Sequence, residues 1–141
     1  MLNNRHALIT GAGSGIGAAV TLALAKQGCR LTLAGRAHDK LKAQAEALYA
    51  QVPDVAIMLA PMDITDPHAV QAAVQQAQAQ LGPVHILVNN AGQAHSQPFA
   101  RTDATLWQHM LDVNLSGTFH VTQAVLPLML DTAASGTPGR I

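Results

Sequence analysis

The feature that most constrains this chain is a glycine-rich turn, residues 10–17 (TGAGSGIG), which follows a short apolar run over 7–9 and leads into a helical pattern near Ile16. Glycines let the backbone turn tightly and approach a ligand without a Cβ clash. The free N–H groups at a helix start, together with the helix dipole, favour a phosphate. The pattern therefore favours a site for the pyrophosphate of a dinucleotide, although the glycines alone also fit a plain strand-to-helix turn.

Length and composition bound the remaining possibilities. The chain has 141 residues, of which 49% are apolar and 11% charged, and its formal net charge is zero. This predicts one domain with a real core and makes nucleic acid and anionic membranes poor partners. No apolar run reaches the ~18 residues of a membrane span, and the N-terminus lacks the apolar region of a signal peptide, so we expect a cytoplasmic protein. The single cysteine, Cys29, is expected to be a small buried residue.

Short apolar runs alternate with helical periods along the chain, which predicts an α/β fold with a parallel sheet. Strands are expected at 6–10, 31–34, 55–59 and 84–88, and helices at 15–27, 38–50 and 65–81. From residue 102 or 103 a helical pattern continues to about residue 130, in two pieces around 112–114. The last two residues resemble the opening of a fifth strand.

Right-handed crossovers between these strands give a doubly wound, Rossmann-type sheet, incomplete here, with strand order 3-2-1-4. A ligand crevice then lies at the carboxyl ends of strands 1 and 4, where the order reverses. The glycine turn occupies the first of these ends, and residues 89–92 (NNAG) occupy the second. Two independent turn motifs at one crevice support a binding site more strongly than either alone.

The motifs together resemble the short-chain dehydrogenase/reductase family over essentially the whole chain. They are the TGAGSGIG turn, Asp63 after the third strand, the NNAG turn, and Asn114 within residues 112–119 (DVNLSGTF). The resemblance identifies the chain as a nicotinamide-cofactor protein. It implies that the residues contacting the cofactor are Thr10, Gly11, Ser14, Gly15, Ile16, Gly17, Asp63, Ile64, Asn90, Ala91 and Gly92.

Two of these motifs carry a specific role by resemblance. Asp63 would accept a hydrogen bond from the adenine amino group; from the residues alone, a helix cap is the alternative. Asn114 would distort its helix and hold a water in a proton relay, so it is the one catalytic candidate in the chain. An exposed or capping Asn is the alternative there, since Asn is a poor helix former.

Cofactor choice depends on the end of the second strand. A site for NAD usually places Asp or Glu about 20 residues past the glycines, on the ribose hydroxyls. Here that position holds Gly35, followed by Arg36, whose guanidinium could pair with the 2′-phosphate of NADP. We therefore favour NADP, with NAD as the alternative; Ser14 stands where many NADP-type members carry a second basic residue.

The remaining polar and aromatic residues indicate a function less clearly. The seven histidines lack metal-ligand spacing, so no metal is predicted. Gln93 and His95 follow the NNAG turn, where they could face a substrate or simply lie on a surface loop. Trp107 and Phe119 recur at helical spacing and indicate core or subunit contacts.

The resemblance implies hydride transfer between nicotinamide and a small carbonyl or alcohol. Within the family, the chain looks most similar to ketoreductases that act on 3-oxoacyl or polyketide-like substrates. The family's serine and Tyr-x-x-x-Lys pair are absent: the only tyrosine is Tyr49, and Pro53 stands four residues on. We expect these parts beyond residue 141, so that residues 1–141 are the N-terminal part of a single Rossmann-fold domain and are inactive alone. The alternative is a non-catalytic cofactor-binding or interaction fragment. By resemblance, the long helix over 105–130 forms a homodimer or tetramer contact.

Overall fold

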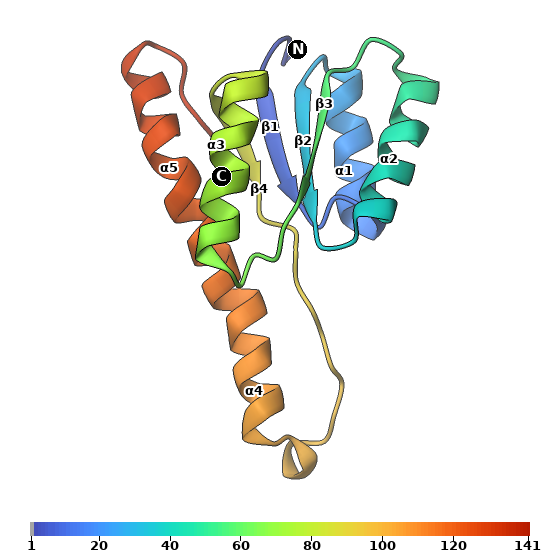
Figure 1. The fold of residues 1–141 in the computed structure, drawn as a ribbon, viewed down its shortest axis with the longest axis vertical. Helices are drawn as coiled ribbons and strands as arrows, with labels where there is room; N and C mark the ends of the chain where they lie inside the picture. The colour runs from blue at the N-terminus through green and yellow to red at the C-terminus, as the bar shows by residue number, and fades with distance from the viewer. Residues whose placement is uncertain (1) are drawn as a thin grey trace.

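The computed structural model describes residues 2–141, which form a parallel four-stranded sheet with helices on both faces (Figure 1). The strand order is β3-β2-β1-β4, as the right-handed crossovers predict. The strands are β1 His6–Thr10, β2 Arg30–Gly35, β3 Ile57–Pro61 and β4 Val84–Val88. The helices are α1 Gly15–Lys26, α2 His38–Gln51, α3 Pro67–Leu81, α4 Ala104–Leu111 and α5 Thr118–Ala134, with a 3₁₀ turn (η1) at Phe99–Arg101 and a π-helical segment (η2) at Asp112–Gly117.

Alternating strand residues divide the core into two layers. Ala7 and Ile9 of β1 pack toward α1 and α2, whereas Leu8 packs toward α3 and α5. Because β1 is covered on both faces, all five of its residues are buried. Strands of this kind read as continuous apolar runs, and for that reason the sequence located the central strands well.

The third strand begins two residues later than the apolar pattern predicted. Its pairing with β2 starts at Leu31 opposite Ile57 and ends at Gly35 opposite Pro61. Val55 is buried, but it lies before the strand. The apolar pattern therefore identified a buried residue at position 55, but not the residue at which pairing with β2 begins. Pro61 is tolerated because β3 is an edge strand, where a missing N–H costs little.

The helical region after residue 103 is continuous through its predicted break. Between α4 and α5 the chain forms the π-helical segment η2, and α5 continues to Ala134, four residues beyond the predicted end. A Cβ on Gly117 would lie 2.5 Å from Ile64, so only a glycine lets this segment approach the β3–α3 connection so closely. The arm, residues 93–111, extends from the body beyond the carboxyl edge of the sheet (Figure 1).

The last residues begin to pair with β4. Arg140 forms a parallel bridge to Ile86, with Arg140 N–H donating to His85 O at 2.9 Å and Leu87 N–H donating to Arg140 O at 2.9 Å. The predicted start of a fifth strand is therefore present as a single bridge.

Candidate functional site

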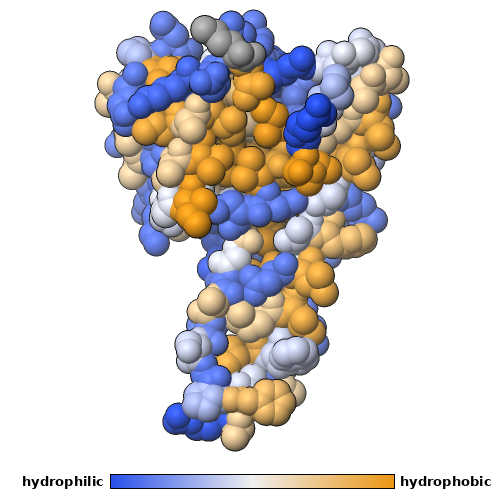
Figure 2. All heavy atoms as spheres, turned by 180° about the vertical axis from the view of Figure 1, so that it is seen from behind, coloured by the Kyte–Doolittle hydropathy of each residue, from blue (hydrophilic) through white to orange (hydrophobic). Residues whose placement is uncertain are grey.

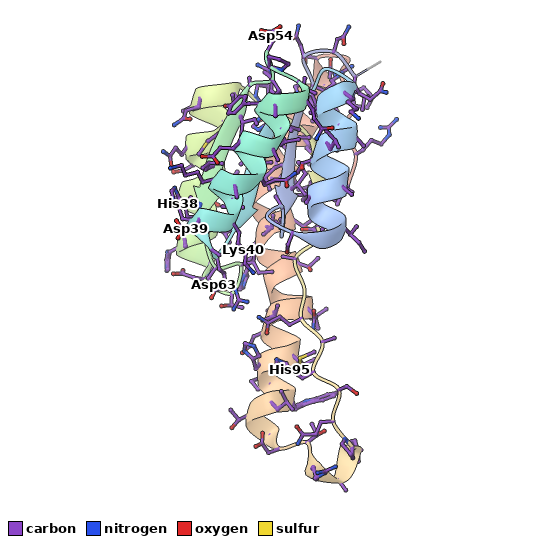
Figure 3. The ribbon with its side chains drawn as sticks, turned by 90° about the vertical axis from the view of Figure 1, so that its right-hand side faces the viewer. His38, Asp39, Lys40, Asp54, Asp63 and His95 are labelled. Carbon is purple, nitrogen blue, oxygen red and sulfur yellow. The ribbon has the colours of Figure 1, made fainter. Side chains whose placement is uncertain are left out.

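A cavity of about 290 Å³ opens at the carboxyl edge of the sheet. Five segments line it: the glycine turn, the end of β2 with the start of α2, the β3–α3 connection, the turn after β4, and η2 through Val113. Its predicted members are Gly11, Ser14, Arg36, Asp63, Ile64, Asn90, Ala91 and Gly92. Figure 3 shows Asp63 and Lys40 together at this edge, while His95 lies further along the loop toward α4. The structure thus brings segments that are far apart in the sequence, from Gly11 to Val113, to one hollow.

The glycine turn needs glycine at three of its positions. Gly11 and Gly15 have φ of +64° and +54°, in the region that side chains disfavour. Gly17 is buried beneath the turn, where an added Cβ would lie 2.6 Å from Asn90 Nδ2 and closer still to Gly11 O. Gly15 and Gly17 do not line the cavity themselves; they shape the turn that does.

The start of α1 leaves backbone donors free of side-chain partners. Ser14 occupies the N-cap position, yet its side chain makes no capping hydrogen bond within the described residues. The first N–H groups of a helix have no partners inside the helix, and they carry its positive dipole end. This donor set, beside the cavity and with no Cβ on Gly13 or Gly15, fits a pyrophosphate. Ile16 is 76% exposed at the same helix start but does not line the cavity.

Thr10 and Asn90 tie the two turns together. Thr10 Oγ1 accepts hydrogen bonds from the N–H groups of Asn90 at 3.1 Å and Ala91 at 3.0 Å. Asn90 Nδ2 donates to the carbonyls of Thr10 and Gly11, both at 3.1 Å. Thr10 therefore acts from behind the cavity wall, by fixing the residues that line it.

Asp63 is held by its neighbour in the chain. Its Oδ1 accepts from Thr65 N–H at 2.9 Å and Thr65 Oγ1–H at 2.8 Å. The backbone hydrogen bond from Thr65 is the main reason that the pKa of Asp63 lies below its usual value, and Arg36 adds to the effect. The cap of α3 is instead Asp66, which accepts from His68 N–H and Ala69 N–H. Asp63 is therefore an ionised acceptor at the cavity and not the helix cap that was its alternative.

Asn114 does not line the cavity but positions Gln93, which does. Asn114 lies in the π-helical segment, where its Oδ1 accepts from Gln93 N–H at 3.0 Å and its Nδ2 donates to Gln93 O at 2.8 Å. The side-chain amide of Gln93 lies between Arg36 and His109, and one of its two orientations gives both of them a hydrogen bond. In that orientation Gln93 Oε1 accepts from Arg36 Nη1 at 3.1 Å and Nη2 at 2.5 Å, and Gln93 Nε2 donates to His109 Nε2 at 2.7 Å. Gln93 therefore links Arg36 across the cavity to α4.

Sequence reasoning missed Lys40, which lines the cavity from the first turn of α2. Its Cβ lies 3.0 Å from the position of a Cβ added to Gly13. The available signal was its position: four residues after Arg36, at the start of the helix that follows the second strand.

Other candidates lie outside the cavity. His95 is exposed on the loop, with its ring centroid 6.4 Å from that of His109. Cys29 is buried, and burial raises the pKa of its thiol, which suits a packing role. Trp107 and Phe119 are 59% and 57% exposed, so neither belongs to the core. Within residues 2–141, no group of three or more potential ligands could hold a metal ion.

None of the helices over residues 2–141 is long and apolar enough to cross a membrane.

Known proteins resemble this chain in both sequence and fold. An uncharacterized oxidoreductase of Staphylococcus aureus (strain N315) is 36% identical over 134 residues, which cover 95% of this chain and 56% of that protein. A 3-ketoacyl-(acyl-carrier-protein) reductase from Brucella melitensis, solved with NADH, has a TM-score of 0.88 at 32% identity, over 99% of this chain and 55% of that one. L-sorbose reductase from Gluconobacter frateurii, solved with NADPH and L-sorbose, has a TM-score of 0.86 at 27% identity, over 93% and 49%.

The chain spans about half the length of these relatives. The family model for short chain dehydrogenases matches residues 5–141, which is nearly all of this chain. With the glycine turn, the NNAG turn and the 3-2-1-4 sheet already in place, this match settles the affiliation. The chain belongs to the short-chain dehydrogenase/reductase family.

Proposed function

We propose that the protein is an NADP(H)-dependent oxidoreductase that transfers hydride between the nicotinamide and a carbonyl or alcohol. The observation that carries the proposal is the convergence of the glycine turn, Arg36, Asp63 and the segment 90–92 on one cavity. On this proposal residues 1–141 are the N-terminal part of a single Rossmann-fold domain. Its location would be cytoplasmic.

Each part of the cavity has a proposed role toward the cofactor. The N–H groups at the start of α1, approached over Gly11, Gly13 and Gly15, bind the pyrophosphate, with Ser14 and Ile16 beside it. The Asp63 carboxylate accepts from the adenine amino group, next to the backbone of Ile64. Residues 90–92 flank a ribose, and Gly17 and Thr10 keep the two turns in place. The cofactor supplies the hydride chemistry when bound.

We propose NADP rather than NAD as the cofactor, although relatives in this fold have been solved with either. The end of β2 carries Gly35 and Arg36 and no acidic residue. A carboxylate there would repel a 2′-phosphate, whereas a guanidinium pairs with it.

Asn114 is proposed to have two roles. Its side chain fixes the backbone of Gln93 through two hydrogen bonds, and the distorted helix around it would hold a water molecule that relays protons during the reaction.

The cofactor proposal predicts a change in selectivity on mutation. Titrating the protein with each cofactor by fluorescence should show tighter binding of NADPH than of NADH. Arg36→Ala should weaken NADPH binding by about tenfold or more, as expected for one charge-assisted hydrogen bond, and leave NADH binding nearly unchanged. Tighter binding of NADH by the unmutated protein would contradict the role given to Arg36.

The reaction itself needs a proton donor at the substrate oxygen. No tyrosine and no histidine lines the described cavity, and Tyr49 lies exposed on α2. We therefore expect residues 1–141 alone to bind cofactor without turnover. NADPH oxidation, followed spectrophotometrically with a panel of ketones that includes 3-oxoacyl thioesters, should require a longer chain carrying a serine and a Tyr-x-x-x-Lys pair. Protein-dependent turnover by residues 1–141 would overturn this assignment and make His95 the first acid to test.

Self-association through the helix over 105–130 is also proposed. The apolar residues of that helix divide: Val113, Val121 and Val125 are buried in the core, while Leu115, Phe119, Leu126 and Leu130 are exposed. Figure 2 shows apolar atoms along the arm and over the rear face of the body. Light scattering should show a dimer or tetramer at micromolar concentration, and Phe119→Glu should shift it toward monomer. A stable unmutated monomer would contradict the proposal.

A further inference from the structure

The cavity contains a second cation, Lys40, which lies on the same wall as Arg36. The charged residues among the cavity lining are Arg36, Lys40 and Asp63. Asp63 is the one carboxylate among these residues; it lies on the connection after β3, near enough to Arg36 for that cation to lower its pKa, and its Oδ1 already accepts two hydrogen bonds from Thr65. Both cations of the lining, in contrast, come from the end of β2 and the start of α2. The side formed by the end of β2 and the start of α2 is therefore positive, which favours an anionic group of the ligand there.

The local packing fixes where the Lys40 side chain starts. The next residue, Leu41, is 1% exposed, and its side chain lies within 3.3 Å of a Cβ added to Gly35. Leu41 therefore anchors the first turn of α2 against the end of β2. Gly13 lacks a side chain at the point where the Lys40 Cβ approaches the glycine turn, so the stem of Lys40 lies beside that turn.

The two cations differ in their existing partners. Both terminal nitrogens of Arg36 reach Gln93 Oε1 across the cavity, so part of its donor capacity is used within the protein. The Lys40 side chain makes no ion pair or hydrogen bond within residues 2–141; the nearby Asp39 lies against His38 instead, at 3.9 Å. Lys40 is thus the cation of this wall whose donors remain available to a ligand.

We infer that Lys40 is a specificity-determining residue that binds the 2′-phosphate of the cofactor together with Arg36, an inference that rests on the proposed NADP(H) function. A phosphate monoester carries about −1.5 to −2 charge at pH 7, so two cations match it better than one. Lys40 from α2 supplies the second positive charge that the glycine turn, with Ser14, does not provide.

The test uses two cofactor fragments that differ only by the 2′-phosphate, adenosine 2′,5′-bisphosphate and adenosine 5′-monophosphate. Binding to the whole protein is measured by calorimetry. Lys40→Gln should weaken binding of the bisphosphate by about tenfold or more, as expected for the loss of one charge-assisted contact, and change binding of the monophosphate by less than about twofold. Lys40→Arg should restore most of the affinity, because it restores the charge. Lys42→Gln is the matched control: it removes the same charge from the same helix, outside the cavity.

Three outcomes would overturn the inference in distinguishable ways. Equal weakening of both fragments by Lys40→Gln would place the lysine on the pyrophosphate. No effect of Lys40→Gln, with a bisphosphate preference intact in the unmutated protein, would leave Arg36 as the sole 2′-phosphate ligand. A protein that prefers neither fragment would overturn the proposed NADP selectivity as well. A thermal melt of each variant separates these results from misfolding.

Discussion

Polar groups at the amino edge of the sheet are hydrogen-bonded within the protein, whereas several at the carboxyl edge face an open cavity. At the amino edge His6 is fully buried: its Nδ1–H donates to Gly82 O at 2.7 Å, and its Nε2 accepts from Thr32 Oγ1–H at 2.8 Å. The His6 backbone N–H donates to His85 Nδ1 at 3.1 Å. At the carboxyl edge, the start of α1 has no side-chain cap and the glycine turn lines an open cavity.

The difference teaches where binding arises in this fold. Buried polar groups must find partners, and at the amino edge the protein supplies all of those around His6. At the carboxyl edge donors and an ionised acceptor are left for a ligand, held in place by Thr10 and Asn90 behind them. One edge therefore stabilises the fold and the other is available for function, although the same strands build both.

The strongest way to break the carboxyl edge is Gly17→Ala. The added Cβ would collide with Gly11 O and lie 2.6 Å from Asn90 Nδ2, so the glycine turn must move and loosen its contact with the turn after β4. Overpacking typically costs about 1–3 kcal/mol, and we expect the upper end here, with loss of a measurable NADPH titration. Thermal melts and fluorescence titration measure the two effects.

Gly136→Ala is the control for Gly17→Ala. Gly136 has φ of +92° but no atom of the described residues within 4 Å of an added Cβ, so it carries backbone strain without a clash. It should cost less stability and leave the NADPH titration unchanged. Equal melting temperatures and equal NADPH affinities for the two variants would refute the close-packing argument.

Acid should act on the amino edge. Burial lowers the pKa of His6 from 6.5 to about 4, and the hydrogen bond to Gly82 offsets only part of this; Arg30 and His85 nearby also disfavour the charge. Because the folded pKa is below the unfolded one, the unfolded state binds more protons as the pH falls from 6.5 toward 4. Stability is thus fully present above pH 6.5 and is lost on acidification.

Between about pH 7.5 and about pH 5, this shift corresponds to a loss of about 2 kcal/mol in the free energy of unfolding. The pKa of His85 is also lowered, mainly by burial, and adds in the same direction. Urea titrations at both pH values measure the loss. His6→Gln should lower stability at neutral pH and flatten its pH dependence, whereas exposed His68→Gln should do neither. A pH profile that His6→Gln leaves unchanged would assign the acid sensitivity to other groups.

The sequence predicted the features of the fold that depend on local patterns, and it missed those that depend on backbone geometry or pairing. Apolar runs predicted the strands, because a strand such as β1 that is covered on both faces is buried along its whole length. The right-handedness of the crossovers then predicted the strand order. Turn chemistry placed the glycine turn and the NNAG turn at one cavity. The start of β3 was misplaced because Val55 is buried without being paired. The predicted interruption near Asn114 became a π-helical segment, a backbone geometry that side-chain periodicity does not encode.

The parts that sequence could not supply depend on contacts between distant segments. Lys40 lines the cavity only because Leu41 packs α2 against the end of β2, and Gln93 reaches Arg36 only because Asn114 holds its backbone. The partners of His6 come from residues 32, 82 and 85, so its isolated position in the sequence gave no sign of a satisfied buried site.

The smallest predicted effect sharpens the comparison within one short connection, where Asp63 and Asp66 stand three residues apart. Asp66 caps α3 by accepting from His68 N–H at 2.9 Å and Ala69 N–H at 3.2 Å. Asp66→Ala should therefore cost about 1 kcal/mol of stability and leave NADPH affinity unchanged. Asp63→Asn should do the reverse: an amide oxygen can still accept from Thr65, but the charge beside Arg36 and the second acceptor oxygen are lost. Melts and NADPH titrations of both variants test this, and a shared phenotype would mean that the two aspartates do not divide structure from binding.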